Sequence, residues 1–537
     1  MPENLKIEIS VRMLEISRRE TICIVVLTLA FTFFGTSILA VKCSEHYLDT
    51  AFLLRLTDNI AKTGRPMCQV IASSTYFFFE KNFLAMPAEK LCSDPIGLPK
   101  EADYNYFKFH PHPILYAFAP LVWLFPVSIV LSAAHSISFF GLLGLVYCFL
   151  RRLSTPIFLA IPFVLLVASH PAWSISYFGQ YYVERYSVFL FALFLYLAYT
   201  SQRYFAFSIV VLLISLLSER TPLFMGMLTL VFVVLFHKVL KNNKRIVLLG
   251  FLMIGFGCLL IAMKSSDAKI SIGSINWRHL LDPKALEDCY TFIFFNIFML
   301  GCFSLFNWRA LLLAITAMVP NLLIGIGGAE KSGWATHYHS LYFPVLVWSS
   351  ALGYANFYTL MRKYKLCSPL VLASVVMLST VCLGVDKYRP SFIEFYIHNY
   401  ADFPFVRLFS EYEKYIGQGD AAVQKRMQYN TILAAIPEGS VVSMPEALMP
   451  LLSANRTIHY FPVGLEIADY VLLTGVVVKD NVFIKHSTMP SYLDIKEGEK
   501  INACLFNRMG ELGFDLNHPL FFKDSGIAII RRIAKNS

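Results

Sequence analysis

The chain has 537 residues, of which 56% are hydrophobic and 15% charged, and its mean hydropathy is +0.57. This composition excludes an ordinary soluble protein. Repeated apolar runs near the roughly 20 residues that cross about 30 Å of hydrocarbon predict a multi-span α-helical membrane protein. The net charge of +10 does not indicate a nucleic-acid partner, because the cations lie in short segments between apolar runs, as membrane topology requires.

The first twenty residues are polar, and an apolar run follows them directly. Because no small-residue cleavage site follows that run, the sequence predicts a retained first span at 21–42 and no cleavable signal peptide. A polar and aromatic outer loop is expected over 43–112, and a short re-entrant or interfacial helix over 113–125. Further spans are predicted at 128–150, 156–170, 186–200, 204–218, 221–237, 246–263, 289–307, 309–327, 340–358 and 368–385.

Basic residues between these runs indicate the orientation of the chain. They lie in the N-terminal segment and in alternate connections, and therefore on one side of the membrane, which the positive-inside rule assigns to the cytoplasm. They are Lys6, Arg12, Arg18 and Arg19, then Arg151 and Arg152, Arg203, Lys238, Lys241, Lys244 and Arg245, Arg309, and Arg362, Lys363 and Lys365. We therefore expect eleven spans, a cytoplasmic N-terminus and an extracytoplasmic tail.

The tail differs in kind from the rest of the chain. Short β-like runs at Ser440–Ser443, Tyr470–Leu473 and Ile527–Ile530 alternate with helical patterns at Phe405–Tyr415 and Lys500–Leu512. This alternation predicts a small α/β domain. The expected domains are a transmembrane domain over 1–385, which includes loop 43–112, and an extracytoplasmic α/β domain over 386–537.

The outer loop opens with an amphipathic pattern. Leu48, Phe52, Leu53, Leu56 and Ile60 recur at helical spacing, which predicts a helix at the membrane surface that Gly64 ends. Asp49 lies in the first turn of that helix. It has two interpretations at this point, a helix-end charge or a catalytic carboxylate.

Other ionisable and polar residues gather at span ends on the predicted outer side, where charge near hydrocarbon is costly and often functional. Each has a structural alternative. Glu184 with Arg185 and Glu219 with Arg220 also fit ion pairs that fix helix packing, and the paired histidines fit interfacial roles. The set is Asp49, Asp58, His110, His112, Gln180, Glu184, Arg185, Glu219, Arg220, Lys331, His337 and His339.

No cofactor or metal site is predicted. His110-Pro111-His112 resembles a metal-binding pair, but acidic partners at ligand spacing are missing. Cys68 and Cys92 share the outer loop, and a disulfide between them is left open.

The chain resembles a family of bacterial multi-pass membrane proteins of undefined function, related in architecture to the GT-C superfamily of lipid-linked-sugar glycosyltransferases. The resemblance covers most of the chain in order. The chain departs from the family at two places. The family has a second acid about five residues after the first, and that place is near Leu54 here. The family also has Lys and Asp on either side of the central Glu, whereas Ser218 and Arg220 flank Glu219 here. The matching segments are Tyr47-Leu48-Asp49 through Gly64-Arg65, His110-Pro111-His112-Pro113-Ile114-Leu115, Glu184, Ser218-Glu219-Arg220, His337-Tyr338-His339, and in the tail Ile436–Val442, Leu451–Arg456, Tyr460–Pro462 and Ala468–Leu472.

The resemblance implies a GT-C-like inverting glycosyltransferase of the bacterial inner membrane. Such an enzyme transfers sugar from a polyprenyl-phosphate donor to an envelope glycan or glycolipid on the extracytoplasmic face. It implies that Asp49 is the general base and that Glu219 is a second catalytic acid. Groups near substrate and leaving phosphate would be Glu184, Arg185, Arg220, Lys331, His339 and His110.

Two other classes remain open. A transporter or lipid flippase should show pseudo-symmetric halves and ionisable residues at mid-membrane, whereas no repeat is visible and the ionisable residues lie at one face. A membrane scaffold whose tail binds partners predicts that Asp49, Glu184 and Glu219 are dispensable.

Overall fold

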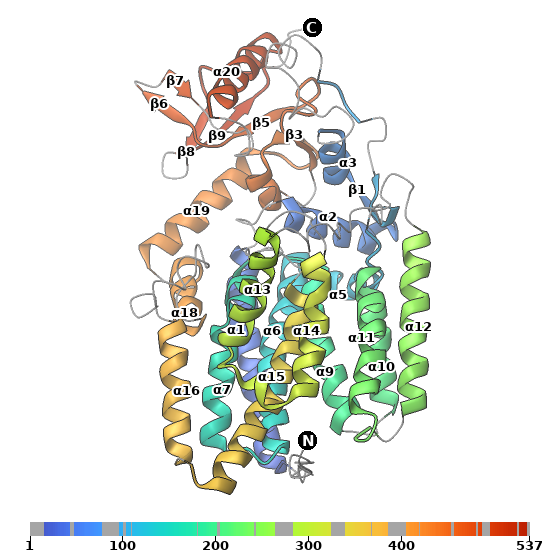
Figure 1. The fold of residues 1–537 in the computed structure, drawn as a ribbon. Helices are drawn as coiled ribbons and strands as arrows, with labels where there is room; N and C mark the ends of the chain where they lie inside the picture. The colour runs from blue at the N-terminus through green and yellow to red at the C-terminus, as the bar shows by residue number, and fades with distance from the viewer. Residues whose placement is uncertain are drawn as a thin grey trace. The chain divides into compact units, whose positions relative to one another are not determined.

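Segments far apart in the sequence fold together into two units in the computed structural model (Figure 1). The helical unit comprises residues 1–37, 108–114 and 132–410, and the mixed unit comprises 38–107, 115–131 and 411–537. The structure describes residues 16–42, 48–77, 96–99, 104–108, 110–179, 181–200, 204–240, 243–263, 283–323, 339–366, 368–384, 404–417, 419–452, 456–479, 482–485, 495–522 and 526–533.

Helices fall on the predicted spans. Within the helical unit most apolar runs become one helix each, whereas the run predicted as a span at 289–307 is interrupted at residues 299–302. The helices are α1 (Arg18–Lys42), α6 (Val127–Arg152), α7 (Ile157–Ser169), α8 (Pro171–Phe178), η6 (Val183–Tyr186), α9 (Ser187–Thr200), α10 (Tyr204–Leu217), α11 (Arg220–Phe236), α12 (Asn243–Ala262), α13 (Pro283–Phe298), η10 (Phe303–Phe306), α14 (Trp308–Leu323), α15 (His339–Tyr364), α16 (Pro369–Gly384) and the start of α18 (Pro404–Tyr415).

Length and composition mark fewer of these helices as membrane spans than the sequence predicts. Among the described residues four qualify, namely α1, α6, the run Val183–Thr200 and α12. The pair α7 and α8, bent by 57° at His170, would make a fifth. The helices at Phe205–Leu217, Arg220–Phe236, Cys289–Phe298 and Pro369–Val381 are apolar but shorter. A protein with several helices able to span a membrane is therefore supported, and the number eleven stays a prediction.

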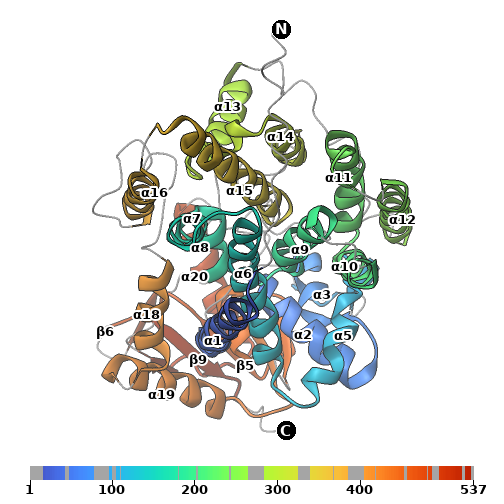
Figure 2. The same ribbon diagram turned by 90° about the horizontal axis from the view of Figure 1, so that it is seen from below.

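Small residues allow close packing between α11 and α12, which lie side by side in Figures 1 and 2. A Cβ on Gly226 would meet the Gly250 carbonyl oxygen at 2.7 Å, and one on Gly257 would meet the Leu223 amide nitrogen at 2.9 Å. The helix backbones therefore touch directly, as is common between membrane helices.

Helix α15 forms the core of the helical unit. It is buried continuously from His339 to Ala355 and packs against α9, α14 and η10. Trp348 lies among aromatic rings, with Phe149 at 5.8 Å and Phe236 at 5.4 Å between ring centroids. At Gly353 the backbone of Phe303 approaches so closely that an added Cβ would clash with its carbonyl oxygen.

The mixed unit begins with α2 (Leu48–Thr63), the amphipathic helix that the sequence predicts. Its apolar side chains are buried, and it packs on β1 (Met67–Cys68), α3 (Gln69–Thr75) and η13 (Glu446–Leu452) of the same unit. Gly64, with φ of +68°, accepts the left-handed conformation that ends the helix. The apolar face predicted to lie on lipid is thus covered by protein, because η13 from the tail packs against it.

A mixed β-sheet forms the other part of this unit. The described strands are ordered β4 (Thr457–Tyr460), β3 (Val441–Met444), β5 (Tyr470–Leu473), β9 (Ile527–Arg531) and β8 (Leu520–Phe522). The pairs β3–β4 and β3–β5 are parallel, whereas β5–β9 and β8–β9 are antiparallel. With α19 (Asp420–Ala435), α20 (Ile495–Glu511) and the hairpin β6 (Val477–Lys479) and β7 (Val482–Lys485), this confirms the predicted α/β region.

The division of the chain differs from the one predicted at residue 385. Parts of the outer loop belong with the tail: the Tyr460 amide donates to Ser73 Oγ at 3.0 Å, and the Phe77 and Tyr460 rings lie 4.8 Å apart. The Ile96 amide likewise donates to Glu466 Oε1 at 3.0 Å. Loop and tail therefore share one core, which sequence separation conceals. The outer loop also contains the short strand β2 (Tyr104–Asn105), which pairs with β1, and α5 (Ile114–Val122) follows it.

Candidate functional site

The turn between α10 and α11 holds a buried acid–histidine pair. Glu219 Oε1 lies 3.1 Å from His110 Nδ1 and 3.8 Å from Arg220 Nε. The Glu219 side chain is only 2% exposed, whereas His110 is 22% and Arg220 26% exposed. A carboxylate buried to this degree between apolar helices is costly unless it is paired, and both neighbours supply positive charge or donors.

Local hydrogen bonds hold this pair in place. His112 Nδ1 donates to the Leu217 carbonyl at 2.8 Å, and the His110 and His112 rings stack 6.2 Å apart. Thr221 Oγ1 lies 2.9 Å from the Ile214 carbonyl, to which it donates across the turn. These bonds fix the segment before Pro113 to the end of α10, and this places His110 beside Glu219.

The chemistry of the pair follows from its geometry. The Glu219 carboxylate accepts a hydrogen bond from Nδ1–H of the His110 imidazole, which leaves Nε2 as the basic nitrogen of the ring. Because the carboxylate is the more buried partner, it orients the ring and stabilises the imidazolium that forms when Nε2 takes a proton. The arrangement is an acid–base couple in which the histidine is the more exposed partner.

The second predicted pair, Glu184 with Arg185, makes contacts of a different kind. Arg185 in η6 is fully buried; it donates to the Ser176 carbonyl, and its guanidinium lies 5.0 Å from the centre of the Tyr182 ring. Glu184 is 6% exposed. Since Arg185 binds the end of α8, these contacts favour the structural alternative for this arginine over a place beside a substrate phosphate.

His339 belongs to another polar cluster at the start of α15. Its Nδ1 donates to Tyr342 Oη at 3.0 Å, and Tyr342 in turn donates to Asn296 Oδ1 at 3.0 Å. Segment η6 contacts both α10 and α15, and Ser187 Oγ donates to the Ser340 carbonyl at 2.9 Å. Helix ends that carry Glu184, Glu219 and His339 therefore adjoin within the helical unit.

The remaining predicted site residues are only partly described. Asp49 lies in the first turn of α2, as expected, and its side chain is outside the described part of the chain. Lys331, His337, Gln180 and Cys92 also lie outside the described residues. Within the described ranges, no three histidine, cysteine, aspartate or glutamate side chains group as metal ligands.

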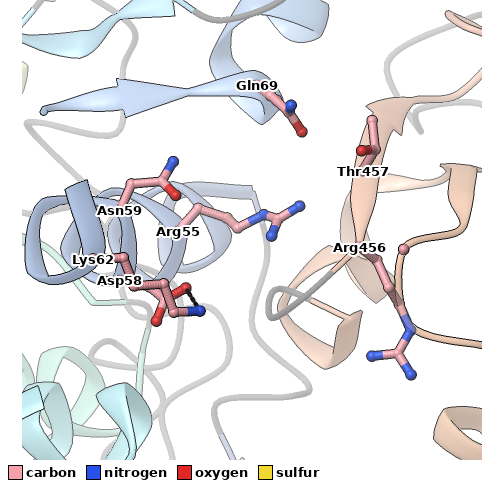
Figure 3. Close-up of a pocket in the computed structure, with 8 residues that line it drawn as sticks. Arg55, Asp58, Asn59, Lys62, Gln69, Arg456 and Thr457 are labelled. Atoms are coloured by element: carbon pink, nitrogen blue, oxygen red, sulfur yellow. Dashed lines mark hydrogen bonds and ion pairs between the residues drawn. The ribbon is translucent and has the colours of Figure 1, made fainter. Parts of the chain in front are cut away.

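A polar pocket in the mixed unit was not predicted. It encloses about 270 Å³ and is lined by Arg55, Asp58, Asn59, Lys62, Gln69, Gly439, Arg456 and Thr457. In Figure 3 the Arg55 guanidinium extends from α2 toward the Arg456 segment, and Asp58 pairs with Lys62 at 2.7 Å. Half of this pocket can be recognised in the sequence, because one face of α2 carries Arg55, Asp58, Asn59 and Lys62 at helical spacing. The other half comes from the tail, and no local pattern reveals it.

A buried histidine in the sheet gives this unit a pH dependence. His459 on β4 is 4% exposed, and neither ring nitrogen has a hydrogen-bond partner in the described structure. Burial lowers its pKa from 6.5 to about 4. Between these values the unfolded chain binds a proton that the folded chain excludes, so stability is complete above about pH 6.5 and declines as pH falls toward 4.

Comparison with known proteins adds no assignment: no protein-family model and no curated protein matches this chain.

Proposed function

We propose that the protein is an integral-membrane, GT-C-like inverting glycosyltransferase. It would transfer a sugar from a polyprenyl-phosphate donor to an envelope glycan or glycolipid on the extracytoplasmic face of a bacterial inner membrane. The observation that supports this best is the buried Glu219 carboxylate, 3.1 Å from the more exposed His110 imidazole, at the end of two apolar helices. An acid–base couple at such a place suits a reaction between a lipid substrate and one from water.

In the proposed reaction, a base removes the proton of the acceptor hydroxyl as its oxygen attacks the anomeric carbon. The bond from that carbon to the phosphate oxygen breaks, configuration inverts, and polyprenyl phosphate leaves with the electron pair. Cations near the leaving group stabilise its charge. Arg220, which is 26% exposed and 3.8 Å from Glu219, is the described residue best suited to that role.

Two residues compete for the role of base. The family resemblance assigns it to Asp49, which lies in the first turn of α2. The contacts of His110 with Glu219 offer a second acid–base group. Substituting each in turn separates them, because the base carries the largest share of the rate and a positioning group carries less.

The transfer is tested by mass spectrometry of envelope glycolipids and glycans from a deletion strain. The strain is complemented with wild type, Asp49→Asn or Glu219→Gln, each expressed at the wild-type level. We expect a sugar-sized mass to disappear on deletion and to return with wild type only. An unchanged envelope on deletion contradicts the proposal.

A proton-coupled transporter is the second candidate, since buried histidine and carboxylate pairs also relay protons in transporters. It is distinguished by substrate movement: vesicles with the reconstituted protein would accumulate substrate when a pH gradient is imposed. Glycosyl transfer instead proceeds without a gradient.

A further inference from the structure

Two cavities of different character meet in the mixed unit. The polar pocket described above shares Asp58, Lys62 and Arg456 with a larger cavity of about 720 Å³. The shared residues place the two cavities next to each other, one lined by polar groups and the other mainly by apolar walls. We call the two together the groove. The apolar walls are Ala40, Val41, Leu54, the turn Val122–Val127, Leu433, Pro450 and Leu451.

Among the described residues that line the polar end, cations outnumber acids. Among its described lining residues there are three cations, Arg55, Lys62 and Arg456, and one acid, Asp58, which pairs with Lys62 at 2.7 Å. Arg55 is only 9% exposed, so its charge lies in a partly desolvated position. Neutral polar groups complete the lining. A site of this kind complements a small anion such as a phosphate.

Arg456 is held rigidly at the junction of the two cavities. Its Nε donates to the Ile436 carbonyl at 3.0 Å, and its Nη2 donates to the Leu433 carbonyl at 3.0 Å. These carbonyls lie at the end of α19, so the arginine also stabilises that helix terminus. Nη2 also donates to the Ile436 carbonyl at 2.7 Å, so the guanidinium is fixed in place before any ligand arrives. Because these carbonyls occupy Nε and Nη2, Arg456 would act on an anion through its charge and not through these two nitrogens.

The apolar end leads to a surface that suits lipid. The turn after α5 exposes Trp123 by 73%, Leu124 by 74% and Phe125 by 53%. Trp123 Nε1 donates to the Ala61 carbonyl at 2.9 Å, which fixes the turn against α2. Large exposed apolar side chains beside an apolar groove favour an acyl or isoprenoid chain as its occupant, and not a free soluble anion.

We propose that this groove binds a phosphate-bearing lipid, with the phosphate at Arg55 and Arg456 and the hydrocarbon chain along the α5–α6 turn. The binding chemistry stands on the groove alone. Only the identification of the lipid with the donor or the leaving polyprenyl phosphate rests on the proposed glycosyltransferase function.

The test is a native mass spectrometry titration of the purified full-length protein in detergent. Two pairs of probes differ only in the phosphate: a long-chain prenyl phosphate with its alcohol, and phosphatidic acid with diacylglycerol. Inorganic phosphate alone is the fifth probe. In at least one pair we expect the phosphorylated lipid to bind about tenfold or more tightly than its neutral partner, and inorganic phosphate to bind far more weakly.

Variants assign the binding to the groove. Arg55→Gln should weaken binding of the phosphorylated lipid about 10- to 100-fold and leave binding of its neutral partner unchanged. Leu124→Glu lies at an exposed position that tolerates substitution. It should weaken binding of both lipids and leave binding of inorganic phosphate unchanged. Arg531→Gln removes an exposed arginine of the same unit that lines neither cavity, and should change nothing.

Several results would overturn the proposal. They are equal binding within both probe pairs, unchanged affinity in Arg55→Gln, or inorganic phosphate binding as tightly as the lipids. Because Arg456→Gln also removes a helix contact, it is informative only with an unchanged melting temperature. Glycosyl transfer is not needed for this measurement, so lipid binding without transfer contradicts the proposed function alone, and transfer without lipid binding contradicts this inference alone.

Discussion

Replacing Glu219 by glutamine tests whether the buried pair is catalytic or only structural. The amide keeps the size of the side chain and can still accept the hydrogen bond from His110 Nδ1, which spans 3.1 Å. What it removes is the negative charge. The substitution therefore separates the electrostatic role of the carboxylate from its role in packing.

The expected effect on stability is small. The gross attraction between Glu219 and Arg220 at 3.8 Å is about 4 kcal/mol at an effective dielectric of about 20. Desolvation of a carboxylate that is 2% exposed offsets most of this. We expect a net change within about 2 kcal/mol, and a change in apparent melting temperature of no more than about 4 °C.

The expected effect on transfer is much larger. When His110 takes a proton, the carboxylate stabilises the imidazolium, and without it general base catalysis loses about 100-fold or more, or about 2.7 kcal/mol of barrier. Because Glu219 acts through His110, His110→Gln should lose at least as much as Glu219→Gln, and the double variant should lose no more than His110→Gln alone.

The assay is the rate of sugar transfer in membranes, divided by the amount of folded protein. Glu511→Gln, which removes an exposed carboxylate of α20, is the matched control. If Glu219→Gln transfers sugar at the wild-type rate per folded molecule while its melting temperature drops, the carboxylate only supports packing and the reasoning fails.

Three further predictions concern Asp49, His459 and Gly353. Asp49→Asn should abolish transfer at normal expression if Asp49 is the base; restored envelope glycans would make it a helix-end charge. Replacing His459 by Phe should remove the loss of thermal stability between about pH 6.5 and 4, worth at most about 3 kcal/mol, and melting curves that still fall equally would contradict the assignment. Gly353→Ala should lower the free energy of unfolding by about 1–3 kcal/mol or more, because the added Cβ clashes with the Phe303 carbonyl. Gly255→Ala is the control: its added Cβ would meet nothing within 4 Å, so this substitution should be neutral or stabilising.

Local patterns in the sequence predict most of the elements. The period of apolar residues defines α2, which the structure ends at Thr63, one residue before the predicted stop at Gly64. The strand predicted at Tyr470–Leu473 is found with those bounds. These features depend on neighbours in the chain, so composition and periodicity are sufficient. The number of membrane spans is harder, because a short apolar helix and a crossing helix share the same local signal.

Long-range associations are what the sequence does not disclose. The sequence marks both His110 and Glu219 as candidates, but it favours an interfacial role for His110 because its acidic partner is 109 residues away. Arg55 and Arg456 were not candidates at all, since neither belongs to a charged cluster in the sequence. Each becomes notable only when the first loop packs on the tail, as the bond between Ser73 and Tyr460 illustrates.

The two polar sites differ in how their charges are balanced, and on this basis we propose different tasks for them. The carboxylate of Glu219 is buried beside a histidine and an arginine, so its charge is matched and its partner can exchange a proton. At the α2 pocket, the described lining residues include two arginines and a lysine but one acid, and Glu438 lies near Arg456; this majority of cations favours an anion. Proton exchange belongs with the first arrangement and anion capture with the second. A transferase that acts on phosphate-linked lipids requires both, which is why the two proposals support each other although their tests are independent.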